Sequence, residues 1–467
     1  MVYVWRVTLV ATLGGLLFGY DTAVISGTVS SLKINFIDSL NLSETLANSL
    51  LGFTVSSALI GCILGGLTGG WMALRLGRRN SMVVAAVLLI ISAIGSAFPE
   101  IILAPVGKDV SGFLTPFIIY RIIGGVGVGL ASMLSPMYIA EIAPASKRGH
   151  LVSWNQFAII FGMLVVYFVN YTISRMGNET WLHESGWRWM FFSETIPGFL
   201  FLLLLFFVPE SPRWLVIKQR EEKAAAILTR INGSAEATRM VAEIRETVTG
   251  NGSARLFSYG YLIVIVGVLL SVFQQFVGIN VVLYYAPEIF RNMGTSTDIS
   301  LLQTVIVGFI NLTFTIIAIY TVDRFGRKPL QIAGALGMAI SMVALGLTFY
   351  FQQMGLAALI FMLTYVASFA ISWGPVTWVL LSEIFPNRIR GRAMAIAVAA
   401  QWISNYLVSW TFPIMDKSSF LNDIFHHGFA YWIYGFMGFV AAWFVWKLVP
   451  ETKGKTLEQM ETLFEIR

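Results

Sequence analysis

Twelve apolar runs separated by polar loops limit what this chain of 467 residues can fold into. Each run reaches about 17 to 20 residues, the length that a helix needs to cross the hydrocarbon of a bilayer. Backbone groups in lipid must be satisfied internally, so we expect an all-α membrane protein with twelve transmembrane helices. The runs cover 7–28, 47–73, 80–99, 115–139, 150–173, 187–208, 257–290, 299–321, 329–351, 355–381, 392–413 and 429–449.

The composition supports lipid as the solvent of this chain. It is 57% hydrophobic and 12% charged, whereas soluble globular proteins carry about 25% charged residues. The net charge of +6 would suit a nucleic acid, but the basic residues lie in short loops between apolar runs, so we expect no such partner. The single cysteine, Cys62, lies inside an apolar run and is interpreted as a packing residue. The histidines show no metal-ligand spacing, and we expect no metal and no cofactor.

The loops alternate between basic and nearly neutral, and this alternation predicts the orientation of the chain. Clustered Lys and Arg stay inside the cell, so we expect a multi-pass plasma-membrane protein with both termini cytoplasmic. The first apolar run is too long for a cleavable signal peptide and lacks a convincing cleavage site. The basic clusters are Arg75, Arg78 and Arg79; Lys147 and Arg148; Arg324, Arg327 and Lys328; and Arg388, Arg390 and Arg392.

One long polar insertion, 211–256, divides the chain between the sixth and seventh apolar runs. Its charged stretches 218–230 and 237–248 carry clustered apolar residues and predict short amphipathic helices on the cytoplasmic side. The predicted organisation is a six-helix bundle over 1–210, a helical linker over 211–256, a second six-helix bundle over 257–450 and a cytoplasmic tail over 451–467.

The two predicted bundles repeat one another weakly in sequence. The segment 141–149 and the segment 383–391 share Glu, Pro, Arg and Gly at the same spacing. Gly77-Arg-Arg likewise corresponds to Gly326-Arg-Lys, and Pro209-Glu-Ser corresponds to Pro450-Glu-Thr. Two parallel repeats of six helices are typical of transporters, which bind substrate near the midplane between the halves.

A carboxylate, Asp21, lies inside the first apolar run, where an ionisable group is costly and predicts a functional site. At about 1.5 Å per residue it lies roughly 22 Å beyond Arg6. Arg121 and Glu194 enter the membrane from the other side and reach a similar depth, which predicts a coupled titrating cluster. An apolar cavity favours a neutral acid and a nearby arginine a charged one, so movement between them would change proton affinity. The alternative is a static ion pair that locks two helices together.

Uncharged polar residues in the later helices predict a site for a neutral, hydroxyl-rich ligand. Amides both donate and accept hydrogen bonds, and aromatic rings suit the apolar face of a sugar. The alternative is that these amides bond only to neighbouring helices. The candidates are Gln156, Gln274, Gln275, Asn280, Trp378, Gln401 and Trp402.

Several motifs together resemble those of the sugar porter family of the major facilitator superfamily, over almost the whole chain. They are Arg121-Ile-Ile-Gly-Gly125, Pro209-Glu-Ser-Pro-Arg-Trp-Leu215, Gln274-Gln-Phe-Val-Gly-Ile-Asn280, Asp323-Arg-Phe-Gly-Arg327 and Pro450-Glu-Thr-Lys-Gly454. Within the family the set is most similar to bacterial D-xylose–proton symporters. The resemblance implies the major facilitator fold, a bacterial inner membrane and alternating-access symport of a proton with a neutral monosaccharide, D-xylose above others.

The resemblance also assigns roles to single residues. It implies that Asp21 takes the proton and that the amides above contact the sugar, with Tyr284, Phe18 and Gly374 lining the site. Two positions depart from the family pattern. Leu74 stands where an acid is common before Arg75, and Met163 stands where the xylose symporters often have a second glutamine. Met163 lies seven residues after Gln156, on the same helix face, so its presence predicts altered affinity or sugar preference.

Matched charges at the cytoplasmic ends of both halves predict a gate. We expect them to form a salt-bridge network between the halves that closes the inner side when the transporter faces outward. The alternative, topology signals alone, suits the loop arginines but not the paired glutamates. The residues are Arg78, Glu141, Arg148, Asp323, Arg327, Glu383 and Arg390.

Glycine and proline mark backbone weak points inside two of the predicted helices. They are Gly278 and Pro287 in the seventh and Gly374-Pro375 in the tenth, and discontinuous helices often line transport sites. Plain packing kinks are the alternative.

Three other classes of function compete with proton-coupled symport. An integral-membrane enzyme would need a catalytic constellation, and the sequence shows no metal motif, nucleophile elbow or phosphate loop. A sugar sensor on a transporter scaffold would need a signalling tail. A facilitative uniporter is the remaining alternative, and Asp21 argues against it. We expect a monomer in the bilayer.

Overall fold

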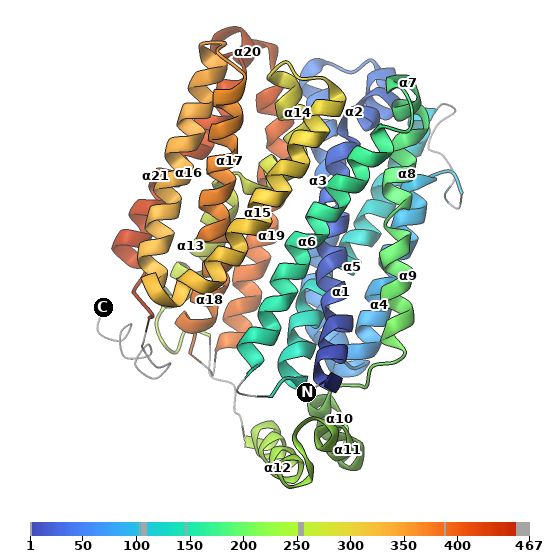
Figure 1. Cartoon of the computed structure of the whole chain (residues 1–467), viewed down its shortest axis with the longest axis vertical. Helices are drawn as coiled ribbons and strands as arrows, with labels where there is room; N and C mark the ends of the chain where they lie inside the picture. Colours follow the sequence, from blue (N-terminus) through green and yellow to red (C-terminus); the bar gives the residue numbers. More distant parts are fainter. Residues whose placement is uncertain are drawn as a thin grey trace.

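The computed structural model describes residues 2–101, 103, 110–144, 147–250, 256–386 and 389–453, and the regular structure of these residues is helical throughout. The predicted tail, 451–467, lies outside the described residues after Lys453. Long helices run side by side in a bundle with a first half (blue to green) and a second half (yellow to red) (Figure 1).

The first half contains the helices up to Leu205. Its longer helices are α1 (Val2–Val24), α3 (Glu44–Arg75), α4 (Arg78–Ala97), α5 (Leu114–Ile142), α6 (Arg148–Ser174), α8 (Trp187–Phe192) and α9 (Thr195–Leu205). Short helices join them at one end: η1 (Ile25–Gly27), α2 (Val29–Leu32), η2 (Lys33–Ile37), η3 (Asp38–Leu40), η4 (Val110–Phe113), α7 (Glu179–Trp181) and η6 (Leu182–Gly186).

The second half follows the linker. Its helices are α13 (Tyr261–Phe276), α14 (Ile279–Asn292), α15 (Thr297–Phe325), α16 (Arg327–Tyr350), α17 (Leu356–Ile371), α18 (Trp373–Ile384), α19 (Arg390–Asp416), α20 (Ser419–Phe425) and α21 (Gly428–Leu448).

The lengths and surface of these helices suit a bilayer. Eleven helical segments in the described residues are long and apolar enough to cross one. The 27 residues of α19 are also long enough, although its arginines and amides make it less apolar, and it occupies the predicted run 392–413. Large apolar side chains such as Leu67, Phe207 and Phe436 are exposed, as expected where lipid replaces water.

Three of the predicted continuous helices are broken near the middle. Gly278 separates α13 from α14 with φ +90°, and a Cβ there would lie 2.7 Å from the ring of Tyr434, so only glycine fits. The predicted weak point at Gly278 is confirmed, whereas Pro287 stays inside α14. The second break falls at Ser372, two residues before Gly374. A third break, at Ser193 and Glu194 between α8 and α9, was not predicted.

The linker forms three helices, α10 (Pro212–Ile217), α11 (Glu221–Asn232) and α12 (Ser234–Gly250). The two predicted amphipathic stretches correspond to α11 and α12, while α10 was not predicted. Trp214, Ala224 and Leu228 belong to a small apolar core that these helices share, and the Trp214 indole donates to the carbonyl of Leu74 (3.0 Å). The helices project from the end of the bundle where the chain begins (Figure 1). We call this the linker end, and the end that carries α7 and α20 the opposite end.

Candidate functional site

An ion pair between α1 and α5 is buried inside the first half. Arg121 donates from Nη1 to Oδ1 of Asp21 (2.8 Å) and from Nη2 to the Asp21 carbonyl (3.2 Å). Asp21 is 0% exposed and Arg121 is 1% exposed. The guanidinium also lies 5.4 Å from the ring centre of Phe191, which adds a cation–π contact. Removing either partner would leave an uncompensated charge in an apolar interior.

Glu194 completes this cluster from the break between α8 and α9. It is 1% exposed, and its carboxyl interacts with the charges of Asp21 and Arg121. In the described part of the chain neither of its carboxyl oxygens meets the geometry of a hydrogen bond. The depth estimate from sequence placed the three groups at one level, and the structure brings them together.

Glycines allow the helices to approach closely enough to enclose the cluster. A Cβ on Gly19 would lie 1.8 Å from the carbonyl oxygen of Ile159, so α1 and α6 are in backbone contact there. A Cβ on Gly124 would lie 2.2 Å from the Ser92 hydroxyl and 3.4 Å from Oδ1 of Asp21. A side chain at either position would therefore push apart the helices that hold Asp21.

The second half contributes a connected set of amides. Gln274 donates to the carbonyl of Trp373 (2.8 Å), at the start of α18. Gln401 on α19 donates to Oε1 of Gln274, and Gln275 donates to the same oxygen (3.4 Å). Asn280 donates to Oε1 of Gln275. Four of the predicted amides therefore form one network, which joins α13, α14 and α19; we call it the amide network.

Aromatic groups lie near this network. The rings of Phe18 on α1 and Trp402 on α19 are 5.6 Å apart, so this pair joins the two halves. Gly374 offers its carbonyl to Gln274 at 3.4 Å. Tyr284 accepts a hydrogen bond from Asn405 (3.3 Å). Uncharged donors, acceptors and rings in this arrangement suit a neutral polyhydroxy ligand.

Three of the positions highlighted by the sequence are not tied to the amide network. Gln156 on α6 and Trp378 on α18 are half-buried, and the described residues give neither of them a hydrogen bond to it. Met163, which lies two helical turns after Gln156, is 8% exposed. These side chains remain candidates through the resemblance and not through an observed contact.

At the linker end the two halves build the same constellation of charges. Glu210 accepts from the backbone N–H of Arg78 (2.8 Å) and of Arg79 (3.1 Å), which caps α4. Glu451 accepts from the backbone N–H of Arg327 (3.1 Å) and of Lys328 (3.0 Å), which caps α16. A carboxylate is favourable at both places because a helix N-terminus carries unsatisfied N–H groups and positive potential.

The same constellation contains the predicted gate glutamates. Arg78 pairs with Glu141 (2.8 Å), and the hydroxyl of Ser211 also bonds Glu141. Arg327 pairs with Glu383 (3.0 Å), which accepts from Thr452 as well (2.6 Å). The internal repeat predicted from sequence is confirmed by these matching contacts.

Both of these ion pairs stay within one half, and a network between the halves remains a prediction. Arg390 donates from Nε to the carbonyl of Phe385 (3.1 Å), again within the second half. The side chains of Arg148 and Asp323 lie outside the described residues.

At the opposite end, contacts cross from one half to the other. Thr297 donates to Glu179 (2.6 Å), and Arg175 pairs with Asp298 (3.1 Å). On another side of the interface, Glu44 at the start of α3 accepts from the backbone and hydroxyl of Ser419. The opposite end is therefore fastened across the interface.

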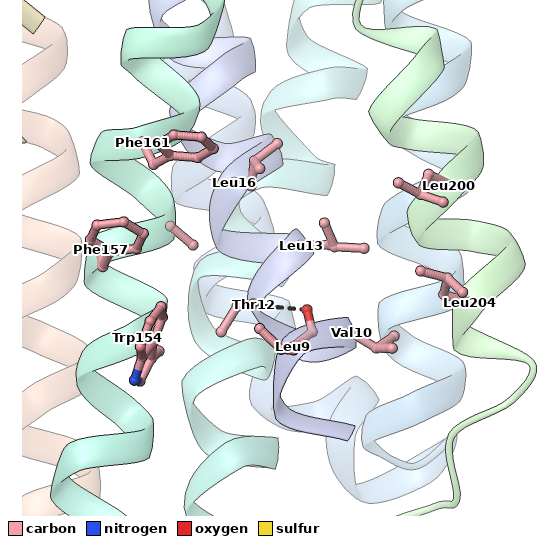
Figure 2. Close-up of a pocket in the computed structure, with 11 residues that line it drawn as sticks. Leu9, Val10, Thr12, Leu13, Leu16, Trp154, Phe157, Phe161, Leu200 and Leu204 are labelled. Atoms are coloured by element: carbon pink, nitrogen blue, oxygen red, sulfur yellow. Dashed lines mark hydrogen bonds between the residues drawn. The ribbon is translucent and has the colours of Figure 1, made fainter. Parts of the chain in front are cut away.

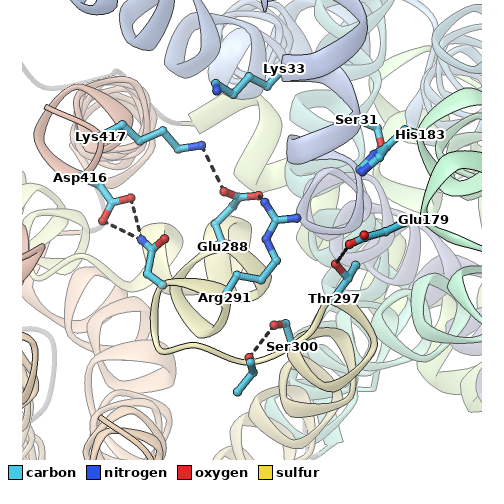
Figure 3. A network of polar contacts seen from close by, with 12 residues as sticks. Ser31, Lys33, Glu179, His183, Glu288, Arg291, Thr297, Ser300, Asp416 and Lys417 are labelled. Carbon is cyan, nitrogen blue, oxygen red and sulfur yellow. Dashed lines mark hydrogen bonds and ion pairs between the residues drawn. The ribbon is translucent and has the colours of Figure 1, made fainter. Parts of the chain in front are cut away.

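A second group of charges at the opposite end centres on residues of the second half, and Lys33 of the first half interacts with the charge of Glu288 there (Figure 3). Buried Glu288 accepts from Arg291 (2.9 Å) and Lys417 (3.1 Å). Asp416 contacts His427 at 3.2 Å. Burial alone would lower the pKa of His427, but the hydrogen bond and charge of Asp416 raise it above its ordinary value.

Comparison with known proteins decides the family. The family model "Sugar (and other) transporter" matches residues 7–464. The chain belongs to the sugar transporter family. It is 63% identical to the D-xylose-proton symporter of Escherichia coli strain K12, over 99% of this chain and 96% of that protein. It is 43% identical to the glucose facilitated diffusion protein of Zymomonas mobilis, over 99% of this chain and 97% of that one.

Solved structures of sugar transporters show the same fold. A partially occluded, inward-open structure of the E. coli xylose transporter matches with a TM-score of 0.89 and 61% identity, over 98% of this chain and 100% of that one. The proton:xylose symporter bound to 6-bromo-6-deoxy-D-glucose matches with a TM-score of 0.83 and 63% identity, over 99% of each chain. The predicted major facilitator fold with twelve helices is confirmed.

Sequence reasoning missed several buried polar groups of this sugar transporter, among them Glu288 and Asn405. Glu288 is an acid near the end of an apolar run, and the rule that drew attention to Asp21 could have found it. Asn405 lies four residues after Gln401, on the same face of α19, and that spacing was its only signal. Its partner Tyr284 is on another helix, which no spacing rule reveals.

An apolar groove on the outside of the first half is unsuited to a sugar. It has a volume of about 330 Å³, between α1, α6 and α9. The side chains that face it in Figure 2 are apolar except for Thr12 and the indole of Trp154, and Thr12 bonds its own helix at the Leu9 carbonyl (2.8 Å). Leu9, Phe161 and Leu200 are exposed there, as expected for a surface in contact with lipid.

Proposed function

We propose that this sugar transporter carries D-xylose into the cell together with a proton, by alternating access. The observation that carries the proposal is the buried cluster of Asp21, Arg121 and Glu194 in one half, beside an uncharged amide network in the other. The 63% identical relative is named a D-xylose-proton symporter, which supports both the sugar and the ion.

Proton binding would occur at Asp21. In this structure Arg121 lies 2.8 Å from Asp21, and the two opposite charges balance one another. A movement of α1 against α5 that lengthens this contact would favour the protonated acid, because the surroundings are apolar. Glu194, close enough to interact with both charges, would hold or share the proton.

The energy of one proton is sufficient for accumulation. A potential of 100 mV supplies about 2.3 kcal/mol per charge, and one pH unit adds about 1.4 kcal/mol. Their sum of about 3.7 kcal/mol corresponds to a concentration ratio of several hundred for a neutral solute.

Sugar binding would occur at the midplane between the halves. Gln274, Gln275, Asn280 and Gln401 would supply hydrogen bonds from the second half. The remaining contacts would come from Gln156, Trp378, Trp402, Tyr284, Phe18 and Gly374. The breaks at Gly278 and Ser372 lie beside the amide network and would allow α14 and α18 to move with the substrate.

We take the structure as an inward-facing state, with the linker end in the cytoplasm of a bacterial cell and both termini there. Two observations support this assignment: the opposite end is fastened across the interface, and the backbone is more similar to the inward-open xylose transporter (TM-score 0.89) than to the sugar-bound one (0.83). In an inward-facing state the salt bridges that we expect between the halves at the inner gate would be broken. The working unit would be the monomer, because each site lies within one chain.

Reconstitution tests the proposal. Purified protein in proteoliposomes should concentrate labelled D-xylose when the outside is made acidic, and should only equilibrate it without a gradient. Labelled D-glucose in parallel measures sugar preference. Equilibration that ignores an imposed pH gradient would identify a facilitative uniporter instead, and binding without any transport would identify a sensor.

A further inference from the structure

Four buried aromatic rings lie beside the ion pair of Asp21 and Arg121. The Arg121 guanidinium lies 5.4 Å from the centre of one of these rings, that of Phe191. Each of the four side chains belongs to a residue that is at most 1% exposed. We call them the aromatic cluster: Phe36 on η2, Phe117 on α5, and Trp187 and Phe191 on α8.

The rings of the aromatic cluster pack directly on one another. The ring centre of Phe117 lies 5.9 Å from that of Phe36, 6.3 Å from Trp187 and 5.4 Å from Phe191. Trp187 lies 5.7 Å from Phe36 and 6.3 Å from Phe191. These distances are typical of rings in contact, and a core packed in this way has few voids large enough for a water molecule.

The aromatic cluster lies on the side of the ion pair that faces the opposite end. The helices α5 and α8 both begin at that end and run toward the linker end (Figure 1). Phe117 precedes Arg121 by four residues, and Trp187 precedes Phe191 by four, so each lies about one turn nearer the opposite end. Within the first half, the rings therefore separate the ion pair from the solution at the opposite end.

Proton coupling requires a barrier at this place. Asp21, roughly 22 Å beyond Arg6 in a hydrocarbon layer of about 30 Å, lies nearer to the outer side. The contacts across the interface at the opposite end close the route between the halves. They do not close a route through the interior of the first half. Water along such a route would let protons reach Asp21 from outside while the sugar site is open to the inside, and protons would then enter without sugar.

We propose that the aromatic cluster is a barrier to protons inside the first half, so that Asp21 exchanges protons only through the space between the halves. Proton and sugar then share one gate. This inference rests on the proton site proposed above. Ordinary core packing would produce the same ring contacts but would give these rings no influence on proton flux.

The test measures proton entry without sugar. Proteoliposomes that contain a trapped pH indicator are placed in acidic medium without xylose. Phe117→Ser replaces a ring by a hydroxyl beside the Trp187 indole N–H, which has no acceptor in the described residues, and a cavity with polar groups can hold water whereas an apolar one stays dry. Proton entry should rise about tenfold, which corresponds to a barrier lower by about 1.4 kcal/mol. Phe117→Leu keeps the site apolar and should leave proton entry unchanged.

Control variants separate this barrier from general damage to the fold. Phe349 is a buried ring at the opposite end of the second half, 5.1 Å from the ring of Tyr431. Phe349→Ser should lower the melting temperature without raising proton entry. Phe36→Ser lies on the short helix η2 and covers the case in which Phe117→Ser does not fold; it should also raise proton entry. Adding Asp21→Asn to either of these two variants should abolish the extra flux, because the route leads through the Asp21 carboxylate.

The outcomes distinguish the barrier from the proposed function. The inference is overturned if folded Phe117→Ser and Phe36→Ser admit no extra protons, if Phe349→Ser admits as many, or if the extra flux survives Asp21→Asn. Exchange of labelled for unlabelled xylose should persist in the variants of the aromatic cluster. If the natural protein does not accumulate xylose under a pH gradient, the proposed symport itself is wrong, whatever the proton entry in these variants.

Discussion

The two halves of this transporter are alike at the linker end and unlike in the middle. At the linker end each half caps a helix with the glutamate of Pro-Glu-Ser or Pro-Glu-Thr and pairs an arginine with a second glutamate. In the middle, the first half buries Asp21, Arg121 and Glu194, whereas the second half places four linked amides. The two halves are therefore similar in the charges at the linker end and different at the places where ligands would bind.

This difference indicates that the two halves bind different ligands. Ionisable groups in the first half suit a proton, and neutral amides in the second half suit a sugar. Coupling between them must cross the interface, where Phe18 packs on Trp402 and where Tyr284 lies close enough to Asp21 and Arg121 to interact with their charges. The predictions below test this division, beginning with the largest effect.

Asp21→Asn should abolish proton coupling, which we assign to the first half, and spare sugar binding, which we assign to the amides of the second half. Without an acid at this position, the xylose gradient in proteoliposomes under an imposed pH gradient should fall from tenfold or more to about one. Exchange of labelled for unlabelled xylose should persist within a few-fold, because the amide network is intact. The asparagine oxygen still accepts from Arg121, which limits the cost of the broken ion pair.

A buried acid of the second half provides the matched control. Asp416 is 1% exposed and bonds Asn292 and His427, away from the proposed proton path. Asp416→Asn should retain accumulation. If the Asp21→Asn variant still accumulated xylose, the proposed proton site in the first half would be wrong.

Gln274→Leu should have the next largest effect, because Gln274 connects three helices. Its loss removes the acceptor of the Gln401 and Gln275 NH₂ groups and the side-chain donor to the carbonyl of Trp373. We expect xylose binding to weaken about 10- to 100-fold in calorimetry, which corresponds to one or two lost hydrogen bonds. Protonation of the first half, followed as pH-dependent tryptophan fluorescence, should be unaffected.

Gln331 on α16 is a suitable control for this substitution. It is a fully buried glutamine that bonds Thr377 (3.1 Å) and receives the Trp373 indole at its carbonyl, outside the amide network. Gln331→Leu should lower the melting temperature and leave xylose affinity within twofold. Equal losses of affinity in both variants would mean that the amides serve the fold alone.

The sequence could predict the membrane helices better than the contacts between them at the amide network. Run lengths predicted the helices, and depth counting predicted that Asp21, Arg121 and Glu194 lie at one level, since both follow from the thickness of the bilayer. The break at Ser193 and Glu194 was missed, although Pro197 marks it. A proline cannot donate the hydrogen bond that a continuous helix would make to the Ser193 carbonyl. The bonds from Gln274 to Trp373 and from Asn405 to Tyr284 join different helices, and their register depends on packing that periodicity does not encode.

Glu383→Gln tests the constellation of charges that both halves build at the linker end, and we expect a moderate effect. The pair of Glu383 with Arg327 and its bond from Thr452 are already present in this inward-facing structure. The predicted network between the halves would use the charge of Glu383 in addition when the linker end closes. Without that charge the closed form should lose stability, and the inward-open form should gain about fivefold in population. Distances between spin labels at the linker end measure the population of the inward-open form. Glu141→Gln in the first half should produce a similar shift if the two constellations are equivalent, and unchanged distance distributions in both variants would argue against a gate.

Met163→Gln should have the smallest effect and tests whether the first half contributes to the sugar site at a position besides Gln156 and Phe18. Met163 is 8% exposed and shares a helix face with Gln156. A thioether cannot donate a hydrogen bond, so a glutamine there should strengthen xylose binding about two- to fivefold. This is less than the effect of a full hydrogen bond, because ordering the amide against the sugar costs rotamer freedom. Met163→Leu, which keeps the apolar character and the volume, should bind as the natural protein does. If the glutamine variant also leaves affinity unchanged, position 163 takes no part in sugar recognition, and the contribution of the first half rests on Gln156 and Phe18.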